Sequence, residues 1–245
     1  MNLRDLIRGF DGVTVEGDPT GVTEAVPIER CYRETLSWTR HDVGVKGGVV
    51  VAGPDQLIDG AETIVRHEHP RWLFGRMVER LHPRRTLRLE IVDDVEIATG
   101  AVIGGDGFAF DMWDGRWYRF PHIGGVRIGS GTTIGANTCI DRGSLGDTVI
   151  GADCQIDNLV HVAHNVLMGR GVMVVAGTVI GGSAAIGDYA WLGMGCRIAE
   201  GVTVGAFAFI GAGAVVTKDV EPMAAIVGVN RRIELDPTVR PRLGY

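Results

Sequence analysis

Aliphatic residues recur at every sixth position through the second half of the chain, from Ile150 to Val216. Glycine follows many of them directly, and the same phase appears earlier in the segments 91–103 and 128–140. A period of six fits neither an α-helix nor a β-hairpin, but it fits a triangular prism whose sides are short parallel strands. The pattern therefore predicts a mainly β protein built on a parallel β-helix, with aliphatic side chains inside and Gly, Asn or Asp at the corners.

The repeat divides the chain into three predicted parts. Residues 1–85 lack it and predict a small α/β domain, in which VPIERCY and GGVVVAG are typical of strands and PRWLFGRMVERL is typical of a helix. Residues 86–220 predict the β-helix. Residues 221–245 predict a short C-terminal tail, too rich in proline for a long helix.

The repeat is interrupted twice, and each interruption is an insertion. Between Ile103 and Ile128 lies the aromatic-rich segment GDGFAFDMWDGRWYRFPHIGG, and DRGSLGDT adds residues between Ile140 and Ile150. Loops that leave a rigid solenoid are places where binding groups can be mounted. The alternative is that both insertions only brace neighbouring coils.

Composition and charge exclude some classes of function. The chain of 245 residues is 45% hydrophobic and carries a net charge of −6, which argues against binding nucleic acid or an anionic membrane. MNLRDLIRGF predicts a short amphipathic helix rather than a signal peptide, and no apolar run in the sequence is long enough for a membrane span. We therefore expect a cytoplasmic protein with reduced cysteines at Cys31, Cys139, Cys154 and Cys196.

Two histidines, His161 and His164, stand out in the segment DNLVHVAHNV. Because Val162 is an inward position, alternation turns His161 outward and places His164 at or just before a corner. A coil of three hexads then stacks Gly182 beside His164. A histidine generally titrates near neutral pH and a glycine backbone can offer an N–H to an oxyanion, so this pair is half of an acyl-transfer site. The alternatives are two histidines at a subunit interface and glycines that only form a corner.

These motifs resemble a known family. GDGFAF, IGANTCIDRGSLGDTVIG and IDNLVHVAHNV follow, in order and spacing, the UDP-3-O-acylglucosamine N-acyltransferases of the lipid A pathway. The resemblance implies a left-handed β-helix, a homotrimer with sites between subunits, a nucleotide-sugar substrate, an acyl thioester donor and no permanently bound cofactor. IGAGAVVTKDVEPMAAIVGVNRRI instead resembles acetyl-CoA-dependent hexapeptide transferases, so the choice between acyl-CoA and acyl carrier protein as donor stays open.

The resemblance also assigns roles to individual residues. It implies that His164 is the general base and that the N–H of Gly182 holds the thioester oxyanion. Asp157 and Asn158 fall on a pair that lies near the acyl and amine groups in the family. Trp38 falls near the uracil-stacking aromatic residue, although a tryptophan in the core or at an interface is an alternative.

Some positions depart from the family or compete with these assignments. A glutamine is usual where His161 stands, so His161 is taken as a substrate-binding candidate. A second active-site histidine is usual near Gly201 and is absent there. Trp113 and Trp117 in the aromatic insertion are further candidates for stacking on a nucleotide base.

The sequence thus predicts an N-acyltransferase that moves an acyl group from a thioester directly to the amine of a nucleotide-linked amino sugar, without a metal. One alternative is a catalytically silent binding or scaffold protein on the same fold. Another is a zinc lyase of the γ-carbonic-anhydrase type, with His161, His164 and His122 as ligands, although their spacing is not that of the family.

Overall fold

The computed structural model describes residues 1–17, 21–27, 35–83, 86–228 and 231–233. The chain forms two compact units, each with its own internal contacts. Unit 1 comprises Met1–Thr86 and Phe108–Ile123, and unit 2 comprises Leu87–Gly107 and Gly124–Tyr245. The aromatic insertion that interrupts the repeat therefore belongs largely to unit 1.

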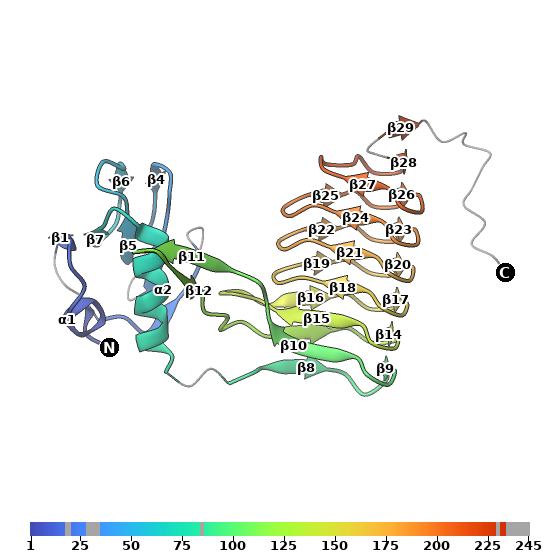
Figure 1. Cartoon of the computed structure of the whole chain (residues 1–245), viewed down its shortest axis with the longest axis horizontal. Coiled ribbons are helices and arrows are strands. Elements are labelled where there is room, and N and C mark those ends of the chain that lie inside the picture. The colour runs from blue at the N-terminus through green and yellow to red at the C-terminus, as the bar shows by residue number, and fades with distance from the viewer. Residues whose placement is uncertain (18–20, 28–34, 84–85, 229–230, 234–245) are drawn as a thin grey trace. The chain divides into compact units, whose positions relative to one another are not determined.

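Unit 1 is a five-stranded sheet covered by a helix (Figure 1). Its sheet order is β1 (Thr14–Gly17), β7 (Thr63–Arg66), β5 (Val49–Ala52), β3 (Thr35–Trp38) and β2 (Glu24–Ala25). β1 is antiparallel to β7, and the other neighbours are parallel. The remaining elements are α1 (Leu3–Ile7), α2 (Pro70–Leu81), the pair β4 (Val43–Gly44) and β6 (Ile58–Asp59), and the hairpin β11 (Phe110–Trp113) and β12 (Arg116–Arg119).

Local sequence explains α2 and its packing. The helix begins at Pro70, a residue suited to the first helical turn because it has no N–H to leave unpaired. Leu73 and Met77, four residues apart on one side of the helix, are fully buried, and α2 contacts β3, β5 and β11. GGVVVAG contains β5, as expected, whereas most of VPIERCY lies outside the described residues.

Unit 2 is a parallel β-helix with three faces, and Figure 1 shows its coils stacked from β8 to β28. The first face consists of β10 (Val102–Asp106), β15 (Cys139–Arg142), β18 (His161–Val162), β21 (Val179–Ile180), β24 (Arg197–Ile198) and β27 (Val215–Val216). The second consists of β8 (Leu89–Ile91), β13 (Val126–Ile128), β16 (Thr148–Ile150), β19 (Leu167–Met168), β22 (Ala185–Ile186) and β25 (Thr203–Val204). The third consists of β9 (Glu96–Ile97), β14 (Thr133–Ile134), β17 (Gln155–Ile156), β20 (Met173–Val174), β23 (Trp191–Leu192), β26 (Phe209–Ile210), β28 (Ala225–Val227) and the antiparallel β29 (Arg231–Ile233).

The interior of unit 2 follows the hexad register. Ile140 pairs with Val162, and Val162 pairs with Ile180, so the inward side chains stack directly on one another. These residues belong to one continuous buried cluster, in which Cys154 and Cys196 are also fully buried. The parallel β-helix predicted from the period of six is confirmed.

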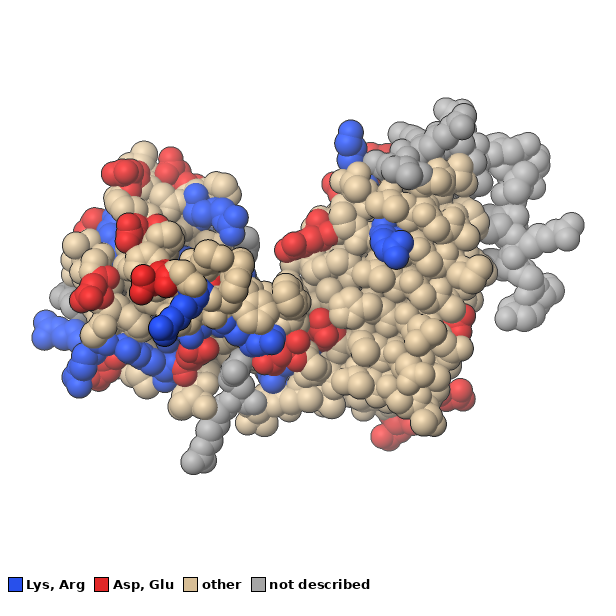
Figure 2. Space-filling model, viewed as in Figure 1, with Lys and Arg blue, Asp and Glu red and all other residues tan. Residues whose placement is uncertain are grey.

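Charged residues are unevenly distributed over the surface. Figure 2 shows many Lys, Arg, Asp and Glu side chains on the visible face of unit 1 and few on the visible face of unit 2. On the first β-helix face, the outward register positions are uncharged at Val102, Cys139, Val179 and Val215, whereas His161 and Arg197 occupy the other two. None of the helices in the described residues is long and apolar enough to cross a membrane.

The stacked interior gives a direct stability prediction. Ile180 is fully buried, whereas Leu167, an outward residue on β19, is 54% exposed. Ile180→Ala leaves a cavity inside a rigid column and should cost about 2–5 kcal/mol of unfolding free energy. Leu167→Ala is the matched control and should change it by less than about 0.5 kcal/mol. Urea unfolding followed by circular dichroism measures both, and equal losses would contradict the assigned register.

Candidate active site

His164 lies at the corner after β18, with its ring against the backbone of the next coil. The N–H of Ser183 donates to the C=O of His164 over 2.9 Å, which joins the two corners. A Cβ built on Gly182 would lie 2.7 Å from Cε1 and 2.8 Å from Nε2 of the His164 ring. Because that space is too small for a side chain, glycine is required for this close approach. The predicted stacking of Gly182 beside His164 is present.

Gly182 provides a backbone donor next to this ring. Its C=O accepts a hydrogen bond from the N–H of Gly201 over 2.9 Å. Among the hydrogen bonds of the described residues, none has the N–H of Gly182 as its donor. Buried backbone N–H groups rarely lack a partner, so a ligand oxygen would be stabilised at this position.

Asp141, a carboxylate on β15, lies beside both histidines. Nε2 of His161 is 3.7 Å from Oδ2 of Asp141, and the two side chains are 42% and 16% exposed. Burial raises the pKa of Asp141, whereas positive charge on His161 and His164 acts to lower it. Negative charge on Asp106 raises this pKa further. The site therefore combines two imidazoles with a partly desolvated carboxylate.

Sequence analysis did not identify Asp141 as a site residue. The signal was present in the register, because Ile140 and Val162 are both inward positions and one coil separates them. That register pairs Cys139 with His161 and brings the end of β15 close to the two histidines.

Asp157 and Asn158 lie at the corner before β18, at the other end of this strand from His164. Oδ1 of Asp157 accepts from the N–H of Asn158 over 2.7 Å, and its Oδ2 accepts from the N–H of Ala176 over 3.1 Å. Oδ1 of Asn158 accepts from the N–H of Ala136 over 2.7 Å. In a single chain these side chains stabilise the corner, and the structure does not bring them together with His164.

Trp38 lies at the end of β3 and lines a cavity of about 270 Å³ within unit 1. The guanidinium groups of Arg40 and Arg71 lie 5.2 and 6.0 Å from the centre of its ring. Arg71 also forms an ion pair with Asp111. An indole and two guanidinium groups around one cavity can bind an aromatic group that carries negative charge.

The other tryptophan candidates have different surroundings. Trp113 packs against His69 and Trp72, with ring centres 4.4 and 5.0 Å apart. It therefore contributes to an aromatic cluster that joins the hairpin to α2. Trp117, on β12, is 66% exposed.

Cys154, Cys196 and His122 have little connection with this site, unlike Cys139, which pairs with His161. Burial raises the pKa of the Cys154 and Cys196 thiols, which disfavours the nucleophilic thiolate. Cys31 lies outside the described residues. His122 is fully buried in unit 1, with Nδ1 3.1 Å from the C=O of Phe120.

Within the described part of the chain, no group of three or more His, Cys, Asp or Glu side chains is arranged to hold a metal ion.

The surroundings of Asp141 give a testable dependence of stability on pH. Its folded-state pKa is raised above the ordinary value of 3.8, so the folded state binds the proton more tightly and stability falls as pH rises through this window. Asp141→Asn removes the cost of burying the charge. At pH 7 it should raise the melting temperature by roughly 2–4 °C, and this gain should disappear below about pH 4.

Calorimetry across this pH range is the measurement, and Asp93→Asn, at an exposed position of unit 2, is the control. A lower melting temperature for Asp141→Asn at pH 7 would show that attraction to His161 and His164 outweighs the cost of burial.

Comparison with known proteins identifies the repeat. The family model described as bacterial transferase hexapeptide (six repeats) matches residues 147–182 and 183–218. UDP-3-O-acylglucosamine N-acyltransferase of Caulobacter sp. (strain K31) is 48% identical over 128 residues, which cover 52% of this chain and 38% of that protein. UDP-3-O-acylglucosamine N-acyltransferase 2 of Legionella pneumophila (strain Lens) is 54% identical over 95 residues, covering 39% of this chain and 28% of that protein. The chain thus spans less than two fifths of the length of these relatives.

Solved structures support the fold. The UDP-N-acetylglucosamine O-acyltransferase of Moraxella catarrhalis is 16% identical, has a TM-score of 0.54, and covers 90% of this chain and 76% of its own. LpxA of Acinetobacter baumannii is 14% identical, with a TM-score of 0.53 and coverage of 86% and 72%. These structures show the fold, and residues 147–218 are similar to the hexapeptide repeat described for bacterial transferases. The resemblance to the UDP-3-O-acylglucosamine N-acyltransferases is confirmed over about half of the chain.

Proposed function

We propose that this protein is an N-acyltransferase that moves an acyl group from a thioester to the amine of a nucleotide-linked amino sugar. The observation that carries the proposal is the His164 ring lying against Gly182, whose N–H has no partner among the described residues. A base and an oxyanion donor are thereby held next to one another on rigid coils.

The chemistry is direct attack without a covalent enzyme intermediate. His164 accepts a proton from the sugar amine as its nitrogen forms a bond to the thioester carbon, and such a base contributes about 10²–10⁴-fold. The carbonyl oxygen becomes an oxyanion that the N–H of Gly182 stabilises. When the C–S bond breaks, the proton on His164 passes to the leaving thiolate, so a free thiol and an amide are released.

Two further groups are proposed to bind substrate, one in each unit taken by itself. The cavity around Trp38 supplies an indole for stacking on a base and guanidinium groups for phosphate. His161 lies next to the general base and is 42% exposed, so it can contact the substrate. The donor is acyl-CoA or acyl carrier protein, no permanent cofactor takes part, and the reaction takes place in the cytoplasm, where such donors are made.

A homotrimer completes the proposed site. Asp157 and Asn158 lie at the opposite end of β18 from His164, so they reach the same substrate only when a second copy presents its corner. The sparse charge on the visible face of unit 2 (Figure 2) favours packing of one copy against another.

The first test is a thiol-release assay with His164→Ala. Acetyl-CoA, longer acyl-CoA and 3-hydroxyacyl carrier protein are each combined with UDP-linked amino sugars, including UDP-3-O-acylglucosamine. We expect turnover with at least one pair and a loss of at least 100-fold in His164→Ala, because the base is gone. His41→Ala, at an exposed histidine of unit 1, should keep wild-type activity.

No thiol release with any pair, or full activity of His164→Ala, would favour the scaffold alternative. The preferred donor also decides between the acyl-CoA and acyl carrier protein alternatives.

A second test uses Gly182→Ala. The added Cβ would lie within 2.8 Å of Nε2 of His164, so the ring must turn away from the oxyanion position. We expect kcat to fall about 10–100-fold, with a melting temperature close to wild type because a side chain moves rather than the coil. Gly44→Ala is the control, since a Cβ there meets nothing within 4 Å. Unchanged kcat in Gly182→Ala would exclude this geometry for catalysis.

A further inference from the structure

We infer that Asn165 is a positioning residue that holds the proton of His164 on Nδ1, and that the loop 143–147 in turn fixes Asn165. The inference rests on the proposed function, because it explains how Nε2 of His164 is kept unprotonated and so able to accept the proton of the amine. The inference gives a role to the four-residue insertion between Ile140 and Ile150. No residue of this insertion takes part in the proposed acyl transfer.

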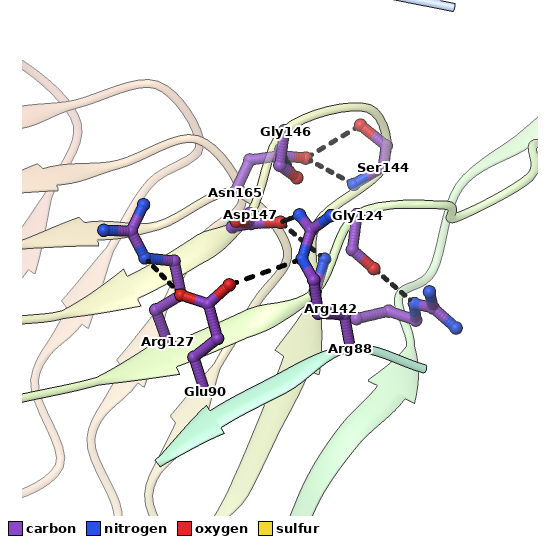
Figure 3. Close-up of polar contacts among 10 residues, drawn as sticks. Arg88, Glu90, Gly124, Arg127, Arg142, Ser144, Gly146, Asp147 and Asn165 are labelled. Atoms are coloured by element: carbon purple, nitrogen blue, oxygen red, sulfur yellow. Dashed lines mark hydrogen bonds and ion pairs between the residues drawn. The ribbon is translucent and has the colours of Figure 1, made fainter. Parts of the chain in front are cut away.

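The orientation of the Asn165 side chain is determined by the loop (Figure 3). Its Nδ2 donates to the C=O of Gly146 over 3.0 Å. Its Oδ1 accepts from the N–H of Ser144 over 3.0 Å and from the Ser144 hydroxyl over 2.8 Å. A flipped amide would place its NH₂ against the Ser144 N–H and its oxygen against the Gly146 oxygen. The hydrogen bonds therefore allow one orientation.

That orientation determines the tautomer of His164. Nδ1 of His164 lies 3.1 Å from Oδ1 of Asn165. Because Oδ1 can only accept, the contact is a hydrogen bond only when Nδ1 carries the proton. In the neutral ring, Nε2 then lacks a proton and has the lone pair that can accept one, and Nε2 is among the ring atoms nearest to Gly182. The basic nitrogen thus lies beside the proposed oxyanion donor.

The backbone of Asn165 and the loop are both anchored. Asn165 has a positive φ of 60°, and its N–H donates to the hydroxyl of Thr148 over 2.9 Å. At the end of the loop, Oδ1 of Asp147 accepts from the N–H of Gly125 over 2.7 Å and also pairs with Arg88 (Figure 3). Movement of Asn165 therefore requires several hydrogen bonds to break together.

A neutral amide suits a general base. It orients the imidazole without adding the negative charge that would stabilise the protonated ring. Asp141 on β15 and His161 on β18 are the titratable groups that the structure describes near His164. A carboxylate at position 165 would add a negative charge to that of Asp141. Unlike Asp141, it would lie in direct contact with Nδ1 of His164.

The test compares Asn165→Gly with Asn165→Asp. Glycine accepts positive φ without strain, so Asn165→Gly should fold while losing the contact to His164. We expect kcat to fall at least 10-fold with little change in KM. Asn165→Asp keeps an acceptor for Nδ1, so it should retain more activity, and the acidic limb of its kcat–pH profile should move to higher pH.

Asn137→Gly is the matched control. Asn137 has a φ of 55° at another corner of the same β-helix, so its replacement removes an asparagine of the same conformation and should leave kcat unchanged. Ser144→Ala removes one donor to Oδ1 and should give a smaller loss than Asn165→Gly. Wild-type kcat and an unshifted pH profile in both Asn165 variants would overturn the inference.

Nitrogen NMR of protein labelled with ¹⁵N-histidine separates this inference from the proposed function. We expect the neutral His164 ring to carry its proton on Nδ1 in the wild type and to become a mixture of tautomers in Asn165→Gly, with His164→Gln identifying the signals. This readout needs no turnover. An Nε2–H tautomer in the wild type refutes the inference even if His164 proves essential, whereas an Nδ1–H tautomer in a protein without thiol release refutes only the acyl transfer.

Discussion

The stacking of aliphatic side chains inside a narrow prism is the constraint on which the rest of unit 2 depends. A side chain that is turned outward at one hexad would expose an apolar group and leave a cavity in the column, so the register cannot slip by one residue. Because Val162 and Ile180 are fixed inside, the neighbouring outward positions and corners are fixed as well. His161 and His164 therefore acquire their positions from residues that take no part in chemistry.

The same constraint explains why the corners carry the candidate chemistry. Inward strand positions in the repeat fill the interior, whereas corners, like outward strand positions such as that of His161, can carry other side chains that the local backbone accepts. His164, Gly182 and Asn165 all lie at corners of the same edge, and their contacts join one coil to the next. Rigid coils hold such groups with less conformational freedom than mobile loops do.

Much of this arrangement could be predicted from the sequence because it follows from periodicity. The β-helix, the bounds of α2 and the approach of Gly182 to His164 each require only a repeat length or a helical spacing. Asp141 was missed because the insertion before Ile150 lengthens one coil. Residues on neighbouring coils are there separated by 22 positions, as Ile140 and Val162 are, so a spacing of 18 does not place Asp141 beside the histidines. The contacts of Asn165 depend on the conformation of the loop 143–147, which no periodic pattern specifies. For the aromatic insertion, the break in the repeat showed where the chain leaves the β-helix but not that its hairpin belongs to unit 1.

The two histidines differ in the groups that surround them, and this difference separates their roles. His161 lies 3.7 Å from a carboxylate, and the two form an ion pair only when the imidazole is protonated. His164 contacts a neutral amide whose orientation favours an unprotonated Nε2. Neighbouring titratable groups with contrasting surroundings are how proteins assign acid and base roles. Within the proposed reaction, His164 is then suited to accept the proton of the amine, and His161 is suited to bind negative charge on the substrate.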